Sequence, residues 1–409
     1  MNAVPNTISL EALSALAREG KARVSSHSGA VAPGDIFVAL PKAAPVGPDG
    51  PDYSAAAGFL TDALRAGAAY AVCTQGVFTA VTDSLAALGT GAKASFAVAL
   101  VDDPREALGV LAKARYGTDD RAVSLLGITG TNGKTTSTYL LEALFRAAGR
   151  VPGVIGTVAY RWPGHEEASP LTTPDCMSLH GMLAAMREAG ADTALMEVSS
   201  HAIEQNRIAG LSFAGALFTN LTQDHLDYHR DMETYFEVKS RLFLNARQGA
   251  ALAVNMDDPY GQRLFDKTPA ALGYGFARHE RRKGRRVLNG LVLEQSREGL
   301  RLRMDFAGEP WELHSPLVGE FNAANLLGVQ ALALAFGLVP RDFRVLETFN
   351  GVPGRLERVP NNRGLAVFVD YAHTPDALQK ALLALRGARF ERIITVFGCG
   401  GNRDRAKRP

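Results

Sequence analysis

A glycine-rich segment between an expected strand and an expected helix has the residue types that bind phosphate. The segment reads Gly130-Thr131-Asn132-Gly133-Lys134-Thr135-Thr136. Glycines let backbone N–H groups turn toward phosphate oxygens, Lys134 would neutralise charge, and the Thr135 hydroxyl could ligate Mg²⁺. A strict Walker A sequence has glycine five residues before Gly133, where this chain has Ile128. The pattern therefore predicts a variant phosphate-binding loop, and the alternative is a tight glycine turn with a surface lysine.

An acidic residue and a histidine follow two other expected strands. Glu197 stands near the end of the apolar run 193–198, and His225 follows the run 215–219. Open parallel sheets bind ligands at the carboxyl ends of their strands, and these donors suit Mg²⁺ beside nucleotide phosphates. Taken singly, Glu197 could cap a helix and His225 could be a core histidine. The residues alone predict an enzyme that uses ATP or GTP with Mg²⁺.

For four further residues, the sequence pattern alone indicates a structural position and no chemical role. Lys239 lies in a helical stretch as a surface lysine would, and Asn322 and Asn325 stand at an expected helix start. His373 is expected in a loop.

The order of expected elements predicts an α/β protein. Buried strands at 121–130, 193–198, 215–219 and 250–254, separated by helix-length segments, indicate a doubly wound parallel sheet. Before it, strands at 35–40 and 69–73 and a helix at 55–66 predict a small α/β domain. We expect domains at 1–117, 118–352 and 353–409.

Two later segments have sequence patterns that differ from that of the central parallel sheet. The stretch 274–317 predicts an exposed hairpin insertion with a solvated charge run at 281–286, and the alternative is a site for an anionic ligand. After a linker at 351–354, a strand at 365–370, a helix at 375–385 and a strand at 392–397 predict a third α/β unit. Because one such unit cannot cover both faces of a parallel sheet, we expect this domain to be incomplete.

Composition excludes several classes of protein. The 409 residues carry 44 Lys+Arg and 42 Asp+Glu, a net charge of +2, which does not favour nucleic-acid binding. Three distant cysteines (Cys73, Cys176 and Cys399) argue against a disulfide framework or a zinc knuckle. The N-terminus lacks a signal-peptide pattern, and the apolar run 323–339 is interrupted by polar residues and predicts a buried helix. We expect a cytoplasmic protein without membrane insertion.

Five segments in one order carry a resemblance to a known family. They are 130–136, Met196-Glu-Val-Ser-Ser-His201, Asp224-His-Leu-Asp-Tyr-His229, Asp370-Tyr-Ala-His-Thr-Pro375 and Gly398-Cys-Gly-Gly401. With them the chain resembles the Mur ligases, and among these the members that form the tripeptide of peptidoglycan precursors. The resemblance implies an N-terminal UDP-binding domain, a central P-loop ATPase domain and a Rossmann-like C-terminal domain, incomplete here.

The resemblance also implies an activity. We expect ATP-dependent ligation of meso-diaminopimelate to UDP-MurNAc-L-Ala-D-Glu through an acyl phosphate, with Mg²⁺, by a monomer whose partners are small molecules. Three alternatives stay open: an L-lysine-adding synthetase, a folylpolyglutamate synthase-like ligase, and a catalytically incomplete fragment that binds nucleotide and the UDP substrate.

Matching positions imply site residues in four groups. The catalytic residues would be Lys134, Glu197, His225 and Lys239, the last matching a lysine that the family carbamylates to N6-carboxylysine. The metal ligands would be Thr135, Glu197, His225 and carbamylated Lys239. ATP contacts would come from Gly130, Thr131, Asn132, Gly133, Lys134, Thr135, Thr136, Asn322, Asn325, Arg355, Asp370 and His373. The UDP substrate would meet Ser28, Thr172, Thr173, Ser199, Gln205 and Arg207, and Arg403 would meet the carboxylate of the incoming amino acid.

Three positions depart from the family pattern. His27-Ser28-Gly29 stands where the family has Asp-Ser-Arg. The resemblance therefore implies weaker affinity for the uridine side of the substrate. The run 400–409 differs mildly from the family's glycine-rich turn. The Asp-Asn-Pro-Arg motif that selects meso-diaminopimelate is absent, so that choice rests on overall resemblance.

Overall fold

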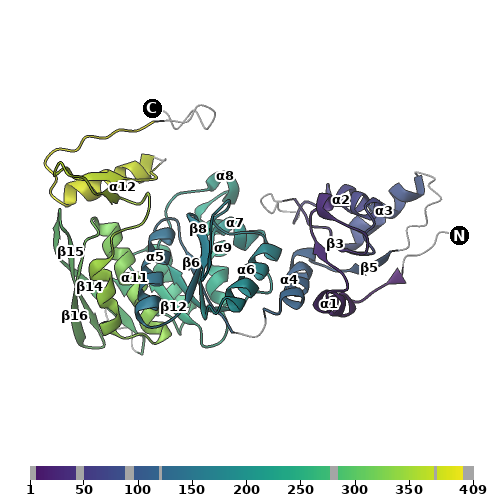
Figure 1. The fold of residues 1–409 in the computed structure, drawn as a ribbon, viewed down its shortest axis with the longest axis horizontal. Coiled ribbons are helices and arrows are strands. Elements are labelled where there is room, and N and C mark those ends of the chain that lie inside the picture. The colour runs from purple at the N-terminus through teal and green to yellow at the C-terminus, as the bar shows by residue number, and fades with distance from the viewer. Residues whose placement is uncertain are drawn as a thin grey trace.

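The computed structural model describes residues 6–42, 50–87, 96–118, 122–276, 284–372 and 375–398. The chain runs from an N-terminal unit at one end, through a large central unit, to a small C-terminal unit at the other end (Figure 1). Within the described ranges, the strands of these units form three separate sheets.

The N-terminal unit is built on a parallel five-stranded sheet in the order β1-β5-β4-β3-β2. Its strands are β1 (Asn6–Thr7), β2 (Val24–Ser25), β3 (Ile36–Val38), β4 (Tyr70–Cys73) and β5 (Ala97–Leu100). Its helices are α1 (Leu10–Arg18), η1 (Ser28–Ala30), α2 (Ala56–Arg65), α3 (Gln75–Ala87) and α4 (Pro104–Tyr116). The predicted α/β character of this part is confirmed, because β3, α2 and β4 fall within the expected runs.

The central unit holds an eleven-stranded sheet in the order β16-β15-β14-β13-β12-β11-β6-β10-β7-β8-β9. Its strands are β6 (Ser124–Thr129), β7 (Pro152–Ile155), β8 (Ala159–Trp162), β9 (His165–Ala168), β10 (Thr193–Glu197), β11 (Phe213–Phe218), β12 (Ala251–Asn255), β13 (Leu272–Gly275), β14 (Val287–Ser296), β15 (Gly299–Phe306) and β16 (Glu309–Ser315). Pairing is parallel from β7 to β14 and antiparallel at both edges. The predicted parallel sheet is confirmed at the centre.

Helices cover both faces of this sheet. They are α5 (Lys134–Ala147), α6 (Cys176–Glu188), α7 (Ser200–Glu204), α8 (Leu226–His229), α9 (Met232–Leu244), α10 (Pro259–Lys267), α11 (Glu320–Phe336) and η2 (Pro340–Thr348). One core contains apolar residues of α5 and α11, and the other contains residues of α6, α9 and α10. The expected buried helix is α11, whose Leu326, Val329 and Leu332 have no exposed surface. No helix in the described ranges is long and apolar enough to cross a membrane.

The predicted antiparallel hairpin is confirmed, because β14 pairs with β15, but its description as an exposed insertion is wrong. Strand β14 pairs in parallel with β13, so β14, β15 and β16 extend the central sheet. Leu288, Leu302 and Met304 on one face of this extension are fully buried. The charge run is not simply solvated either, because the Arg285 guanidinium lies 3.7 Å from the ring centre of Phe265. Residues 281–283 of that run lie outside the described residues.

The C-terminal unit contains the antiparallel strands β17 (Glu357–Val359) and β18 (Val367–Val369) and the helix α12 (Pro375–Gly387). The predicted strand at 392–397 is wrong: this segment has no regular secondary structure, and Val396 is 93% exposed. A strand requires a neighbour for its backbone groups, and β18 pairs only with β17 among the described residues. Helix α12 packs through Ala381 and Ala384 against Val318 and Leu356.

Candidate active site at the phosphate loop

The loop after β6 adopts a backbone that only glycine tolerates at two positions. Gly130 has φ +147° and Gly133 has φ +87°. A Cβ on Gly130 would lie 1.9 Å from Thr219 Oγ1, and one on Gly133 would lie 2.3 Å from Asn325 Oδ1. The glycines therefore let the loop pass close to β11 and α11 before α5 begins at Lys134.

A cavity of about 580 Å³ opens in front of this loop. It lies where the carboxyl ends of β6, β7, β10 and β11 face α11 and α12. The predicted site residues that line it are Thr131, Asn132, Gly133, Lys134, Thr135, Thr136, Thr172, Glu197, His225, Asn325, Arg355 and Asp370. The predicted residues His373 and Arg403 lie outside the described residues.

Glu197 is a buried carboxylate at the end of β10. It is 1% exposed, and its Oε2 accepts hydrogen bonds from Thr135 Oγ1 (3.0 Å) and Thr157 Oγ1 (3.0 Å). The backbone N–H of Thr157 donates to Oε1 at 2.9 Å. Ser199 caps α7, so the capping alternative for Glu197 is wrong. These hydrogen bonds all come from neutral donors, which leaves the negative charge available to a cation.

Two lysines converge on one carbonyl oxygen of the loop. Lys134 Nζ and Lys239 Nζ donate to the Gly130 oxygen at 2.9 and 3.0 Å. Burial lowers the pKa of Lys134, and burial followed by the charge of Lys134 lowers the pKa of Lys239 well below its usual range. Lys239 is 1% exposed and lies 4.7 Å from the ring centre of Tyr235. It is therefore not the surface lysine that pattern alone suggested.

His225 has a different setting from Glu197. Its side chain is 47% exposed, it lines the cavity, and its Nε2 lies 3.4 Å from Asp224 Oδ2, so the core-histidine alternative is wrong. In the described ranges, no three acidic, imidazole or thiol groups gather closely enough to hold a metal by themselves. Mg²⁺ commonly binds one or two carboxylates together with substrate phosphates and water. Glu197 and Thr135, beside a phosphate loop, fit that arrangement.

The residues expected to bind the UDP substrate form one hydrogen-bonded group next to the cavity. Thr173 Oγ1 donates to the Glu197 carbonyl oxygen at 2.8 Å and accepts from the Ser199 N–H at 3.1 Å. Arg207 donates to the Thr173 carbonyl oxygen at 3.0 Å and to Gln205 Oε1 at 2.7 Å. Ser28 lies apart from this group, in η1 of the N-terminal unit.

The structure also alters one expected contact and adds residues that the sequence analysis missed. Asn322 is buried and does not line the cavity; its Oδ1 accepts from Asn325 Nδ2 at 3.4 Å, so it backs the residue that does. Thr157 and Tyr371 line the cavity without having been expected there. Thr157 follows β7 at its carboxyl end, the same signal that pointed to Glu197.

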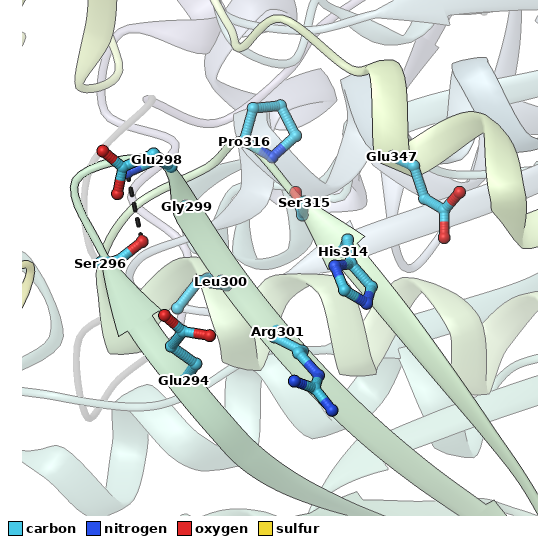
Figure 2. Close-up of a pocket in the computed structure, with 10 residues that line it drawn as sticks. All are labelled: Glu294, Ser296, Glu298, Gly299, Leu300, Arg301, His314, Ser315, Pro316 and Glu347. Carbon is cyan, nitrogen blue, oxygen red and sulfur yellow. Dashed lines mark hydrogen bonds between the residues drawn. The ribbon is translucent and has the colours of Figure 1, made fainter.

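A second hollow, of about 390 Å³, lies at the turn between β14 and β15 and beside η2. Figure 2 shows charged side chains of both signs around it, including Glu294, Arg301 and Glu347. No residue from the predicted site lines this hollow.

Comparison with known sequences identifies the class of protein. The profile of the Mur ligase middle domain matches residues 128–333, and that of the Mur ligase glutamate ligase domain matches residues 354–409. The chain belongs to the Mur ligase family.

Individual relatives narrow the comparison. The chain is 48% identical over 405 residues to the UDP-N-acetylmuramoyl-L-alanyl-D-glutamate–2,6-diaminopimelate ligase of Lawsonia intracellularis, covering 99% of this chain and 80% of that protein. A solved structure of a ligase with the same name superposes with a TM-score of 0.71 at 28% identity, covering 94% of this chain and 74% of that one. The apo form of L. casei FPGS shares the fold, with a TM-score of 0.55 at 16% identity, covering 72% of this chain and 78% of that one.

Proposed function

We propose that the chain is an ATP-dependent ligase that joins meso-diaminopimelate to UDP-MurNAc-L-Ala-D-Glu. The observation that carries this proposal is that the phosphate loop, Glu197 and Thr172 all line the same cavity. The names of the relatives support the substrates, because the relative from Lawsonia is named for this addition and aligns with 99% of the chain. A folylpolyglutamate synthase activity has weaker support, since that likeness is one of fold at 16% identity.

The proposed reaction has two steps. The D-glutamyl carboxylate oxygen forms a bond to the γ-phosphorus of ATP, the bond from that phosphorus to the bridging oxygen breaks, and ADP leaves. The amine of the amino acid then attacks the acyl carbon, loses a proton, and displaces inorganic phosphate. Both steps depend on alignment and on neutralising charge at oxygen.

The residues of the loop side would hold ATP. The backbone N–H groups of the loop and the N-terminus of α5 would bind the phosphates, and Lys134 would neutralise charge on the transferred phosphoryl group. Asn325 would meet the adenine side, supported from behind by Asn322. Arg355 and Asp370 would reach the nucleotide from the C-terminal unit, and both line the cavity.

Mg²⁺ would be held by Thr135 and Glu197 together with ATP, with His225 at the same cavity. When bound it would supply positive charge to the phosphate oxygens. Lys239 fits carbamylation, because its lowered pKa favours the neutral amine, which can bond to the carbon of CO₂ and release a proton. The resulting carbamate would lie beside the Lys134 ammonium, where a negative charge is favoured.

The remaining assignments are part of the same proposal. Residues 1–117 would bind the UDP end through Ser28, residues 118–352 would carry out phosphoryl transfer, and residues 353–409 would deliver the amino acid through Arg403. His373 would contact the nucleotide. We propose a cytoplasmic monomer.

Mass spectrometry of the reaction product tests the proposal. The chain is incubated with ATP, Mg²⁺, UDP-MurNAc-L-Ala-D-Glu and either meso-diaminopimelate, L-lysine or glutamate. A UDP-linked tripeptide formed with meso-diaminopimelate is expected. Product formed only with L-lysine would reassign the amino acid, and substrate binding without any product would identify a catalytically incomplete fragment.

A further inference from the structure

Thr157 forms hydrogen bonds with two residues that line the cavity, Glu197 and Thr172. It follows β7, which pairs with β10 in parallel with Ile155 opposite Met196. The next residues along both strands are Gly156 and Glu197, and a Cβ on Gly156 would lie 2.4 Å from Glu197 Oε1. The strand register therefore brings the segment after β7 into contact with the Glu197 carboxylate.

The hydrogen bonds of Thr157 form a chain across this contact. Its backbone N–H and its hydroxyl donate to the two oxygens of Glu197 at 2.9 and 3.0 Å. Its Oγ1 also lies 3.1 Å from Thr172 Oγ1. Thr172 and Glu197 both line the cavity, and Thr157 lies between them.

The available hydroxyl hydrogens determine which residue donates in each of these hydrogen bonds. An ionised carboxylate only accepts hydrogen bonds, and a hydroxyl has a single hydrogen to donate. Since the Thr157 hydrogen goes to Glu197, the Thr172 hydrogen must go to Thr157. The Thr172 oxygen then faces the cavity with lone pairs only, and it can accept from a ligand but not donate to it.

We propose that Thr157 is a positioning residue that holds Glu197 in place and orients the Thr172 hydroxyl as an acceptor for a donor group on the substrate. The inference rests on the proposed function and deepens it, because it predicts that an N–H or O–H group of the UDP-linked substrate meets Thr172. Thr157 itself need not touch either substrate.

The test compares T157V, which removes the hydroxyl and keeps the backbone N–H, with T157S, which keeps both. The matched control is T268V, since the hydroxyl of buried Thr268 donates only to a carbonyl oxygen of α10 at 2.7 Å, away from the cavity. Two quantities are measured: the Kd of UDP-MurNAc-L-Ala-D-Glu by calorimetry without ATP or metal, and the Mg²⁺ concentration for half-maximal ligation.

We expect T157V to raise the substrate Kd about 3- to 10-fold, the effect of one net hydrogen bond. The Mg²⁺ requirement should rise about 10-fold or more, as when a group that orients a metal ligand is removed. T157S and T268V should stay close to wild type. A T157V protein with wild-type Kd and wild-type Mg²⁺ dependence would overturn the proposal, whereas a wild-type chain that neither binds nor ligates the substrate would overturn the proposed function instead.

A double-mutant cycle gives an independent check. If Thr157 acts on the substrate through Thr172, the T157V/T172V protein should bind the substrate no more weakly than T172V alone. Additive losses in Kd would contradict that linkage. Should T157V fail to fold, T157A removes the same hydroxyl without adding a methyl group, and the same outcomes are expected of it.

Discussion

Replacing Gly130 by alanine should damage the phosphate loop far more than an ordinary glycine substitution. Two costs combine there. A left-handed backbone costs a residue with a side chain about 1–2 kcal/mol. The added methyl group would also lie 1.9 Å from Thr219 Oγ1 and 3.0 Å from the backbone of Asn220, and such overpacking typically costs about 1–3 kcal/mol.

The chain offers a matched control at the other end of the same helix. Gly149 also has a positive φ, +76°, but a Cβ there would meet nothing within 4 Å. G149A therefore carries only the backbone cost and should destabilise by about 1–2 kcal/mol. The difference between G130A and G149A isolates the crowding at the loop.

Thermal unfolding and steady-state kinetics measure the two consequences. At about 2–4 °C per kcal/mol for a unit of this size, G130A should lower Tm by roughly 5–15 °C and G149A by a few degrees. The displaced Gly130 carbonyl also moves Lys134 and Lys239, so kcat/KM for ATP should fall at least about 10-fold at a temperature where both variants are folded. A G130A protein as stable as G149A, with an unchanged kcat/KM for ATP, would refute the account of the loop.

Three further outcomes follow from other contacts. Arg105 donates hydrogen bonds to the carbonyl oxygens of Lys42 and Glu204 and so links the N-terminal unit to α7. We therefore expect R105M to raise the KM for the UDP substrate severalfold and to leave the KM for ATP unchanged. Equal changes in both KM values would contradict this linkage. His180 is fully buried, its Nε2 donates to a backbone carbonyl oxygen at 2.9 Å, and burial lowers its pKa below the usual 6.5. Because the unfolded chain gains this proton first, stability should fall as pH drops below about 6.5, and H180Q should show a weaker dependence in urea titrations at pH 7 and pH 5. For Lys239, ¹³C NMR with labelled bicarbonate should show a carbamate signal that K239M lacks; a signal of equal intensity in K239M would exclude this lysine as its source.

The parts of the site that could be predicted from sequence are local. The run from β6 through the loop to α5 is contiguous, and its glycines, lysine and threonines signal their role by spacing alone. Glu197 could be found because a buried strand ends beside it. Thr157 was missed, since its contact with Glu197 comes from the register between β7 and β10, which no contiguous pattern shows.

The wrong predictions have a common physical reason. The run 392–397 has the residues of a buried strand, but strand formation depends on a neighbour that the described residues do not provide. The alternating residues of β14 and β15 predict an exposed hairpin, yet pairing with β13 and cover by α11 bury one of its faces. The ATP contact of Asn322, by contrast, stays a prediction: the side chain is buried and accepts a hydrogen bond from Asn325.

The most direct test of the central claim is inorganic phosphate release from ATP, comparing the wild-type chain with E197Q. We predict release that requires both UDP-MurNAc-L-Ala-D-Glu and meso-diaminopimelate, and that falls by about 100-fold or more in E197Q, because a buried charge at the phosphate site is removed. Phosphate release that is independent of the UDP substrate, or unchanged in E197Q, would contradict the account.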